Sequence, residues 1–345
     1  MNTKGKIVSI GVAVVLAISG CGKSDGGSKE NTSMNQTEYE KLDLAMAVNG
    51  TDIATDTKVA NKLAELVKEE SGGNIMISVF PNDQLAGGNA TKGIEMAAVG
   101  AVDMAAYASS TLSVLDERLL VGTIPWTFED YRDARETIDT TGGAYYERIL
   151  AEQGLTYLGS AHNGFRQLSN NVRPVKTPED VEGLKIRVPG GEVYMKTFEA
   201  FGADPVAMSW SEAFTAIQQG TIDGQENGFS VTNSAKVYEV QEYMTAWNYT
   251  YENYLFVVSS EIFDSFSPQT QELLREKTLE ACEWGRDLVE DEEEELKVKF
   301  CEEGMEVIEL SQRELEPFKE TVADLQKYLK EKYGPEASKA FGLNE

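Results

Sequence analysis

The sequence predicts an α/β protein in which a mainly parallel sheet carries helices on its faces, in each of two units. In the first half of the chain, short segments of alternating apolar residues are followed by segments with a helical period. A strand–helix–strand order favours parallel pairing with helices packed on the sheet. Of the 345 residues, roughly 305 remain after an N-terminal targeting segment, which is enough for two domains of ordinary size.

The first unit is expected to contain three strands separated by two helices. Residues 42–48 alternate apolar and polar side chains, as a half-buried strand does. A helix is expected over 57–70, where apolar residues recur on one face before a pair of glycines. Residues 75–79 predict a second strand, 91–99 a second helix and 102–105 a third strand.

The second unit is expected to begin near Gly164. Pro178 suits the first position of a helix, and this helix leads into an apolar strand at 184–188. Ser209 and Glu212 have the spacing of a capping box, so we expect a further helix to begin there.

A long helix is predicted over 268–303, with Ser267 before it and Gly304 after it. At 1.5 Å per residue it is roughly 50 Å long, more than one small domain is wide, so we expect it to bridge both units. The acidic run 290–295 is interpreted as a solvated face of this helix. Residues 254–258 predict a strand that returns to the first unit.

The N-terminus has the pattern of a targeting segment. Two lysines precede an apolar stretch, 7–18, that is too short to span a bilayer. The following Ile-Ser-Gly-Cys resembles a bacterial lipobox, which implies a signal peptide at residues 1–20 and a lipid on Cys21. Residues 21–40 are interpreted as this lipidated cysteine and a flexible tether. The alternative is an ordinary secretory peptide with a chance cysteine.

Composition excludes some classes of partner. The net charge of -27 makes nucleic acid an improbable ligand, because phosphate binding needs a basic face. Cys282 and Cys301 lie in one helical pattern and are interpreted as free thiols, and no metal-type spacing is present. His162 is the single histidine, with no nucleophile elbow, phosphate loop or dinucleotide motif. We therefore expect no metal, no cofactor and no enzyme activity.

Arg187 is the first candidate binding residue. It lies toward the C-terminal end of the strand at 184–188, and in open α/β sheets ligands bind at that edge. A guanidinium in a dry cleft needs an anionic partner, and its two parallel donors match a carboxylate. The alternative is a surface arginine on a half-exposed strand.

Three segments occur in an order and spacing similar to one known family. They are 80–85 (Phe-Pro-Asn-Asp-Gln-Leu), 183–189 (Gly-Leu-Lys-Ile-Arg-Val-Pro) and 223–227 (Asp-Gly-Gln-Glu-Asn). Together they resemble the solute-binding proteins of tripartite ATP-independent periplasmic (TRAP) transporters, the DctP-type family. The resemblance extends over about residues 42–333.

The resemblance implies a two-lobed, periplasmic-binding-protein-like fold. Each lobe would hold a mainly parallel sheet, with hinge strands between the lobes and the long helix bridging both. On this basis lobe I is expected to comprise residues 41–163 plus 253–292, and lobe II residues 164–252 plus 293–345.

The resemblance also implies a ligand site. Arg187 would clamp the ligand carboxylate, and Arg166 in the Gly-Phe-Arg-Gln segment would be a second arginine. Asn227 would donate to the same carboxylate, and Trp210 would stack over the ligand. Asn49, after the first strand, would face the ligand from the first lobe.

Several alternatives remain open for these residues. Trp210 could be simple core, Arg166 the partner of a hinge salt bridge, and Asn227 a residue that holds its own turn. Tyr107, Trp126 and Trp210 could present flat faces to a sugar ring, although core packing explains Tyr107 and Trp126 equally well.

The predicted function is that of a monomeric extracytoplasmic receptor, held at the membrane by Cys21. It would capture a small organic acid by hinge closure and deliver it to TRAP membrane permease subunits, and a sugar acid such as a uronate is favoured. Residues 105–110 carry no acid where the sialic-acid branch has one, so sialate is not expected. The alternatives are a C4-dicarboxylate or keto-acid binder and a ligand-sensing lipoprotein.

Overall fold

The computed structural model describes residues 39–343, whose nine strands form a mixed sheet with helices packed on it. The strands follow the order β2-β1-β3-β8-β4-β7-β5-β6, and β9 pairs with β8 off this path. This arrangement confirms the predicted α/β class. Predictions for the signal peptide, Cys21 and most of the tether concern residues outside the described range.

The strands are β1 Leu42–Val48, β2 Ile75–Phe80, β3 Met104–Ala108, β4 Leu155–Asn170, β5 Lys185–Val188, β6 Asp204–Ala207, β7 Gly224–Asn227, β8 Tyr243–Ser259 and β9 Glu306–Glu309.

Eleven α-helices are found in the described range, together with short 3₁₀ segments and one π-helical segment, Ile138–Gly142. The α-helices are α1 Thr55–Glu70, α2 Ala90–Ala98, α3 Ser109–Leu112, α4 Tyr131–Thr137, α5 Gly143–Glu152, α6 Glu192–Ala200, α7 Trp210–Gln218, α8 Phe229–Ser234, α9 Ser260–Ser265, α10 Pro268–Glu302 and α11 Gln312–Ala340. Among residues 39–343, none of these helices is both long and apolar enough to cross a membrane.

Two groups of parallel strands form the ends of the sheet. In the first, β1 pairs in parallel with β2 and with β3, and α1 packs on this group. In the second, β5 pairs in parallel with β6 and with β7. Both groups were predicted as parallel units, because helices separate their strands along the chain.

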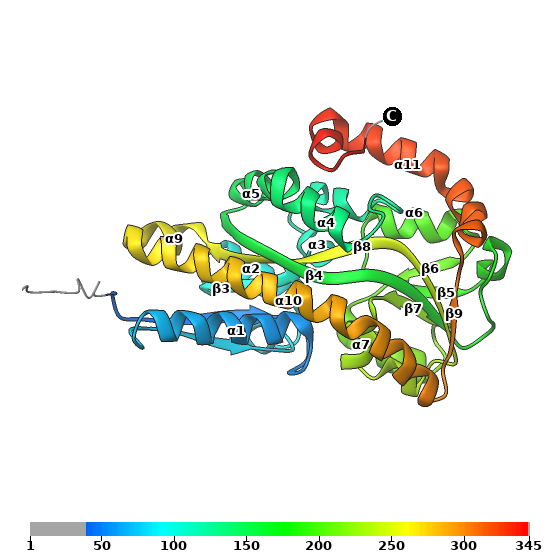
Figure 1. Cartoon of the computed structure of the whole chain (residues 1–345), viewed down its shortest axis with the longest axis horizontal. Coiled ribbons are helices and arrows are strands. Elements are labelled where there is room, and N and C mark those ends of the chain that lie inside the picture. Colours follow the sequence, from blue (N-terminus) through cyan, green and yellow to red (C-terminus); the bar gives the residue numbers. More distant parts are fainter. Residues whose placement is uncertain (1–38, 344–345) are drawn as a thin grey trace, which may run out of the picture. The chain divides into compact units, whose positions relative to one another are not determined.

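The strands β4 and β8 join the two groups and are much longer than the sequence pattern predicts. They pair antiparallel from Leu155 opposite Ser259 to Asn170 opposite Tyr243, and Figure 1 shows both running through the two groups. Only 254–258 was expected to be strand in this part of β8. Apolar and polar residues do not alternate in these strands, because both strands are buried along most of their length and include many buried polar residues.

The helix α10 bridges the two groups as predicted. Its N-terminus is capped by Ser267, whose hydroxyl accepts from Thr270 N, and it contacts α1, β4, α8 and β9 along its 35 residues. Close packing against α1 requires a glycine, because a Cβ on Gly285 would lie 2.3 Å from Val59 Cγ2.

The predicted capping box of α7 is not formed. The helix begins at Trp210 as expected, but the Ser209 hydroxyl bonds to the Glu212 carboxylate and to no backbone N–H of the helix. A complete capping box is found instead at Ser311 and Glu314, at the start of α11.

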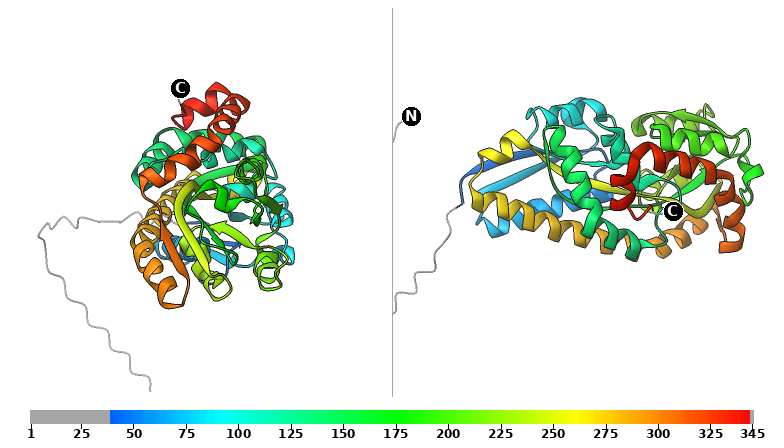
Figure 2. Two further views of the ribbon diagram at one scale, coloured as in Figure 1. Left: turned by 90° about the vertical axis from the view of Figure 1, so that its right-hand side faces the viewer. Right: turned by 90° about the horizontal axis from the view of Figure 1, so that it is seen from above.

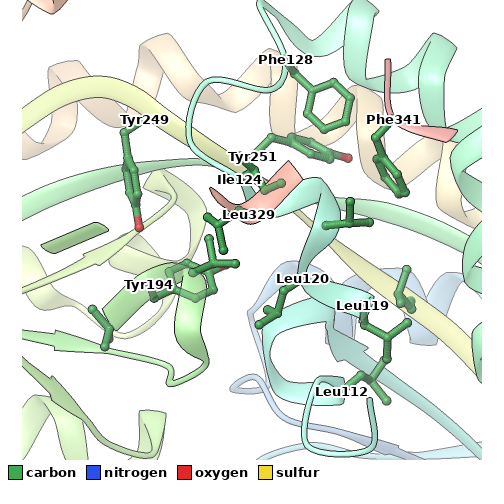
Figure 3. Close-up of a cluster of buried hydrophobic side chains, with 14 of the residues drawn as sticks. Leu112, Leu119, Leu120, Ile124, Phe128, Tyr194, Tyr249, Tyr251, Leu329 and Phe341 are labelled. Atoms are coloured by element: carbon green, nitrogen blue, oxygen red, sulfur yellow. The ribbon is translucent and has the colours of Figure 1, made fainter. Parts of the chain in front are cut away.

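The largest buried apolar cluster lies between α4, α5, α6 and α11 and one face of the sheet. Figure 3 shows part of it, in which Phe128 packs edge-on against Tyr251 at 5.3 Å between ring centroids. A second cluster fills the space between α1, α10 and strands β1 to β3. Figure 2 shows from above how β8 continues from one group of elements to the other. The core therefore supports β4 and β8 on both sides.

Candidate functional site

One small cavity brings together residues from both strand groups. The residues lining it are Asn49, Gly50, Ala54, Ala108, Ser110, Thr111, Asn163, Arg166, Arg187, Pro189, Trp210, Asn227, Val231, Ser234, Glu252 and Tyr254. Its volume is about 40 Å³, which is room for roughly three waters. Five of the six predicted ligand-binding residues therefore line one cavity. The outermost two in the sequence, Asn49 and Asn227, are 178 positions apart.

Arg187 provides a guanidinium that no acidic side chain neutralises. It lies on β5 and is 4 % exposed, and its Nε donates to the carbonyl of Met208 at 2.9 Å. Within residues 39–343, no carboxylate forms an ion pair with it. Burial lowers the pKa of Arg187 to about 10, so the group is still charged at neutral pH. The remaining donors of this cation are available to an anion in the cavity.

Trp210 packs on this guanidinium. It is the first residue of α7, and the Arg187 Cζ lies 5.3 Å from the centroid of its ring. A cation over an aromatic face is attracted by the negative charge of the ring face. Trp210 therefore holds Arg187 in place and also forms a wall of the cavity.

Arg166 lines the same cavity but is fully engaged by carboxylates. Its Nη2 donates to Glu226 Oε1 and to the carbonyl of Glu226, both at 2.8 Å, and its Nη1 donates to Glu252. All three side chains are buried. Burial acts to lower the pKa of Arg166, but the two carboxylates outweigh it and hold the pKa above the usual value. Arg166 is thus the partner in a buried salt bridge, as the alternative that the sequence left open for it describes.

Glu252 is held by four donors. Its Oε1 accepts from the backbone N–H of Ser110 at 3.0 Å and from the Tyr194 hydroxyl at 3.3 Å. Its Oε2 accepts from Asn163 Nδ2 at 2.6 Å and from Arg166. The carboxylate has no capacity left for a ligand, so we interpret Glu252 as a positioning residue.

Asn227 and Asn49 line the cavity and also make local bonds. Asn227 ends β7, and its Nδ2 donates to Gln225 Oε1 at 2.9 Å. Asn49 follows β1, and its Nδ2 donates to the carboxylate of Asp83 at 2.5 Å. An amide nitrogen carries two hydrogens, so each asparagine keeps one donor beyond these bonds.

Tyr107 is not brought to the cavity. It is fully buried in the core, and its hydroxyl donates to Asp83 Oδ1 at 2.8 Å. It also packs against α2, where a Cβ on Gly93 would lie 2.2 Å from the hydroxyl. Trp126 likewise lies away from the cavity, with its ring centroid 6.4 Å from that of Trp247. Tyr107 and Trp126 therefore pack in or against the core, which is the alternative that the sequence left open for both.

A second hollow adjoins the cavity. It has a volume of about 320 Å³ and shares Asn49, Trp210 and Ser234 with the cavity. Its other walls include Asn82 and Lys236, both with positive φ. A ligand that is anchored at the arginine end and extends past Trp210 would therefore reach this hollow.

Sequence reasoning missed Asn163 and Glu252. Asn163 directly precedes the Gly-Phe-Arg-Gln segment of β4, and Glu252 is a single carboxylate in an aromatic-rich part of β8. An acid among aromatic residues in a buried strand is a signal, because it requires a cationic partner. No cluster of residues suited to hold a metal ion is found within 39–343.

Comparisons with known proteins agree with the fold. Residues 46–332 match the model of the DctP family, bacterial extracellular solute-binding protein, family 7. The chain is 33% identical over 249 residues to the 2,3-diketo-L-gulonate-binding periplasmic protein YiaO of Escherichia coli (strain K12), covering 72% of this chain and 75% of that protein. It is 32% identical over 256 residues to the C4-dicarboxylate-binding protein DctB of Bacillus subtilis (strain 168), covering 74% and 73%.

A solved structure is similar over most of the chain. It is the TRAP periplasmic solute-binding protein of Ralstonia eutropha H16 with bound (S)-2-hydroxy-2-methyl-3-oxobutanoate. The two folds superpose with a TM-score of 0.83 and 29% sequence identity, covering 87% of this chain and 98% of that one. The similarity therefore includes both strand groups and the strands that join them.

Proposed function

The chain belongs to the DctP family of bacterial extracellular solute-binding proteins, and from this premise we propose that it captures a sugar acid with a single carboxylate, such as a uronate, for a TRAP transporter. The family consists of extracytoplasmic receptors for small organic acids and not of enzymes. The observation that carries the proposal is the guanidinium of Arg187, which is buried at the cavity and has no acidic partner among residues 39–343.

The balance of charge in the cavity favours one ligand carboxylate. Arg166 is already paired with two glutamates, so Arg187 is the remaining cation among the lining residues. The lining residues from the first part of the chain include the neutral polar side chains of Asn49, Ser110 and Thr111. Such groups suit the hydroxyls of a sugar acid better than a second carboxylate, which would need its own cation.

We propose that binding closes a hinge between two lobes, residues 41–163 plus 253–292 and residues 164–252 plus 293–345. Both lobes supply walls of the cavity, with Asn49 from the first and Arg187 from the second. Closure removes water, and the arginine–carboxylate interaction becomes stronger as the local dielectric falls. The closed protein would then deliver the acid to separate TRAP permease subunits, while a lipid on Cys21 keeps it at the membrane.

A C4-dicarboxylate is the second candidate ligand. Two observations favour it: Arg166 also lines the cavity, and the DctB relative has this ligand class in its name. A dicarboxylate would require Arg166 to exchange a glutamate for the ligand. The two candidates therefore differ in whether the Arg166 ion pairs persist on binding.

A thermal-shift screen of the purified protein tests the proposal. The panel comprises uronates, aldonates, sialate, C4-dicarboxylates, keto acids and neutral sugars. A ligand at 100 times its dissociation constant stabilises the folded state by about 2.7 kcal/mol, which gives a clear increase in melting temperature. We expect shifts with uronates or aldonates. Shifts with dicarboxylates alone would favour the second candidate, and shifts with neutral sugars alone would contradict the carboxylate clamp.

The lipid anchor requires a separate test. Metabolic labelling with an alkyne fatty acid should label the protein in cells, and Cys21→Ser should abolish the label. Equal labelling of the two proteins would contradict lipidation of Cys21.

A further inference from the structure

Asn163 has a buried hydrogen-bond acceptor without a donor. The side chain is 4 % exposed and lines the cavity, and its Nδ2 donates to Glu252 Oε2 at 2.6 Å. The orientation of the amide follows from its partner, because a carboxylate that is ion-paired with Arg166 only accepts. Among residues 39–343, no donor bonds to the remaining atom, Asn163 Oδ1.

The backbone of β4 explains how Asn163 reaches the cavity. Asn163 and Arg166 are three residues apart, and a regular strand would place them on opposite faces of the sheet. The pairing with β8 shifts register between His162 and Gly164, and Gly164 has a φ of +103°. A bulge of this kind redirects a side chain, which here turns Asn163 to the cavity wall that also holds Arg166.

The position of Asn163 along the cavity is fixed by Glu252. Asn163 and Arg166 both donate to the same oxygen, Oε2. The amide therefore lies beside Arg166, in the cavity that Arg187 also lines, and the proposed function places the ligand carboxylate at Arg187. A carboxylate has no hydrogen to donate, so it cannot satisfy Asn163 Oδ1. A hydroxyl on the adjacent carbon is the nearest ligand group that can.

We propose that Asn163 Oδ1 accepts a hydrogen bond from the 2-hydroxyl of the ligand, so that the receptor selects 2-hydroxy acids over acids that lack this group. The inference rests on the proposed function and narrows its ligand class to open-chain sugar acids such as aldonates, because the carbon next to the carboxylate of a ring-form uronate bears the ring oxygen and no hydroxyl. A site built to bond a hydroxyl discriminates against the analogue without it, because the buried protein group then has no partner.

The test compares pairs of acids that differ only in the 2-hydroxyl. Suitable pairs are D-erythronate with 3,4-dihydroxybutanoate, D-galactonate with 2-deoxy-D-galactonate, and D-malate with succinate. Dissociation constants are measured by calorimetry for whichever pair binds. We expect the native protein to bind the hydroxylated acid roughly tenfold or more tightly. If the native protein binds both members of a pair with equal affinity, the proposal is overturned and no variant is needed.

Substitution then assigns the preference to Asn163. In Asn163→Ala the ratio of the two dissociation constants should fall to within about twofold of one, because only the hydroxylated acid loses a bond. A purely structural role would weaken both acids equally and leave the ratio unchanged, which would overturn the proposal. If the alanine variant does not fold, Asn163→Leu provides the same comparison, because leucine has a similar volume and no hydrogen-bond acceptor.

Asn253→Ala is the matched control. Asn253 lies opposite His162 on β8, is equally buried and does not line the cavity. Its replacement should leave the preference for the hydroxylated acid intact. If no acid of any class binds, the proposed function and this inference both fail. If acids bind without a 2-hydroxyl preference, this inference alone fails.

Discussion

Arg166 and Glu226 form a buried ion pair beneath the ligand cavity, with Arg166 Nη2 2.8 Å from Glu226 Oε1. Both side chains are at most 2 % exposed. Glu226 also accepts from the Tyr249 hydroxyl at 2.7 Å. The pair joins β4 to β7, so it links the strand that crosses the sheet to the second group of strands. It also leaves Arg187 as the cation that is free to bind an anion.

Removal of one partner should destabilise the protein. Glu226→Ala leaves Arg166 buried with one of its two carboxylates missing, and breaking a buried pair in this way costs roughly 3–5 kcal/mol. Urea unfolding measures the change in the free energy of unfolding. Arg173→Ala is the control, because Arg173 forms bonds only to backbone carbonyls at the surface. A loss below about 1 kcal/mol for Glu226→Ala would contradict the structural role of the pair.

Trp210 should contribute to ligand affinity through Arg187. Trp210→Ala removes the ring that lies 5.3 Å from the guanidinium and opens one wall of the cavity. We expect affinity for the bound acid to fall by about 1–2 kcal/mol, with Trp210→Phe intermediate. Calorimetry on both variants checks this order. An unchanged dissociation constant in Trp210→Ala would show that the ring is only part of the core.

Stability should depend on pH through His162. The imidazole is buried between Tyr251 and Glu290, and burial lowers its pKa from 6.5 to about 4. The unfolded chain therefore binds a proton at higher pH than the folded protein does. The resulting stability is complete above about pH 6.5 and is lost as pH falls toward 4, in total roughly 3 kcal/mol.

The variant His162→Gln isolates this contribution. Its unfolding free energy should change less than that of the native protein between pH 7 and pH 5, because glutamine does not titrate. Other buried groups, such as Asp56 with its pKa raised by burial to about 6, act equally in both proteins. Parallel curves for the two proteins over this range would contradict the assignment.

The local elements were predictable where one face of the chain is apolar. The long helix was expected over 268–303 and is found at Pro268–Glu302, because its cap and its glycine stop are local signals. The extents of β4 and β8 were missed, since polar residues of these strands are buried and the alternation of apolar and polar residues is absent. Strands of this kind are specified by partners far away in the sequence.

The candidate site also contains some residues that the local sequence indicated and others whose state depends on distant partners. Arg187 was a candidate from its place toward the end of an apolar strand and from the family resemblance, and the structure places it with four other predicted residues on one cavity. The state of Arg166 was not predictable, because both of its partners, Glu226 and Glu252, are distant in the sequence. Tyr107 was predicted to line the site and is found in the core instead, since its packing against Gly93 and Asp83 depends on the folded arrangement.

The central claim is that Arg187 binds the ligand carboxylate, and calorimetry of Arg187→Ala with the acid identified by the screen tests it most directly. We predict a loss of several kcal/mol in binding free energy, with Arg187→Lys intermediate because it keeps the charge and loses the paired donors. The ligand-free variant should be no less stable than the native protein, because Arg187 has no acidic partner to leave behind. A loss of affinity below about 1 kcal/mol would contradict the claim.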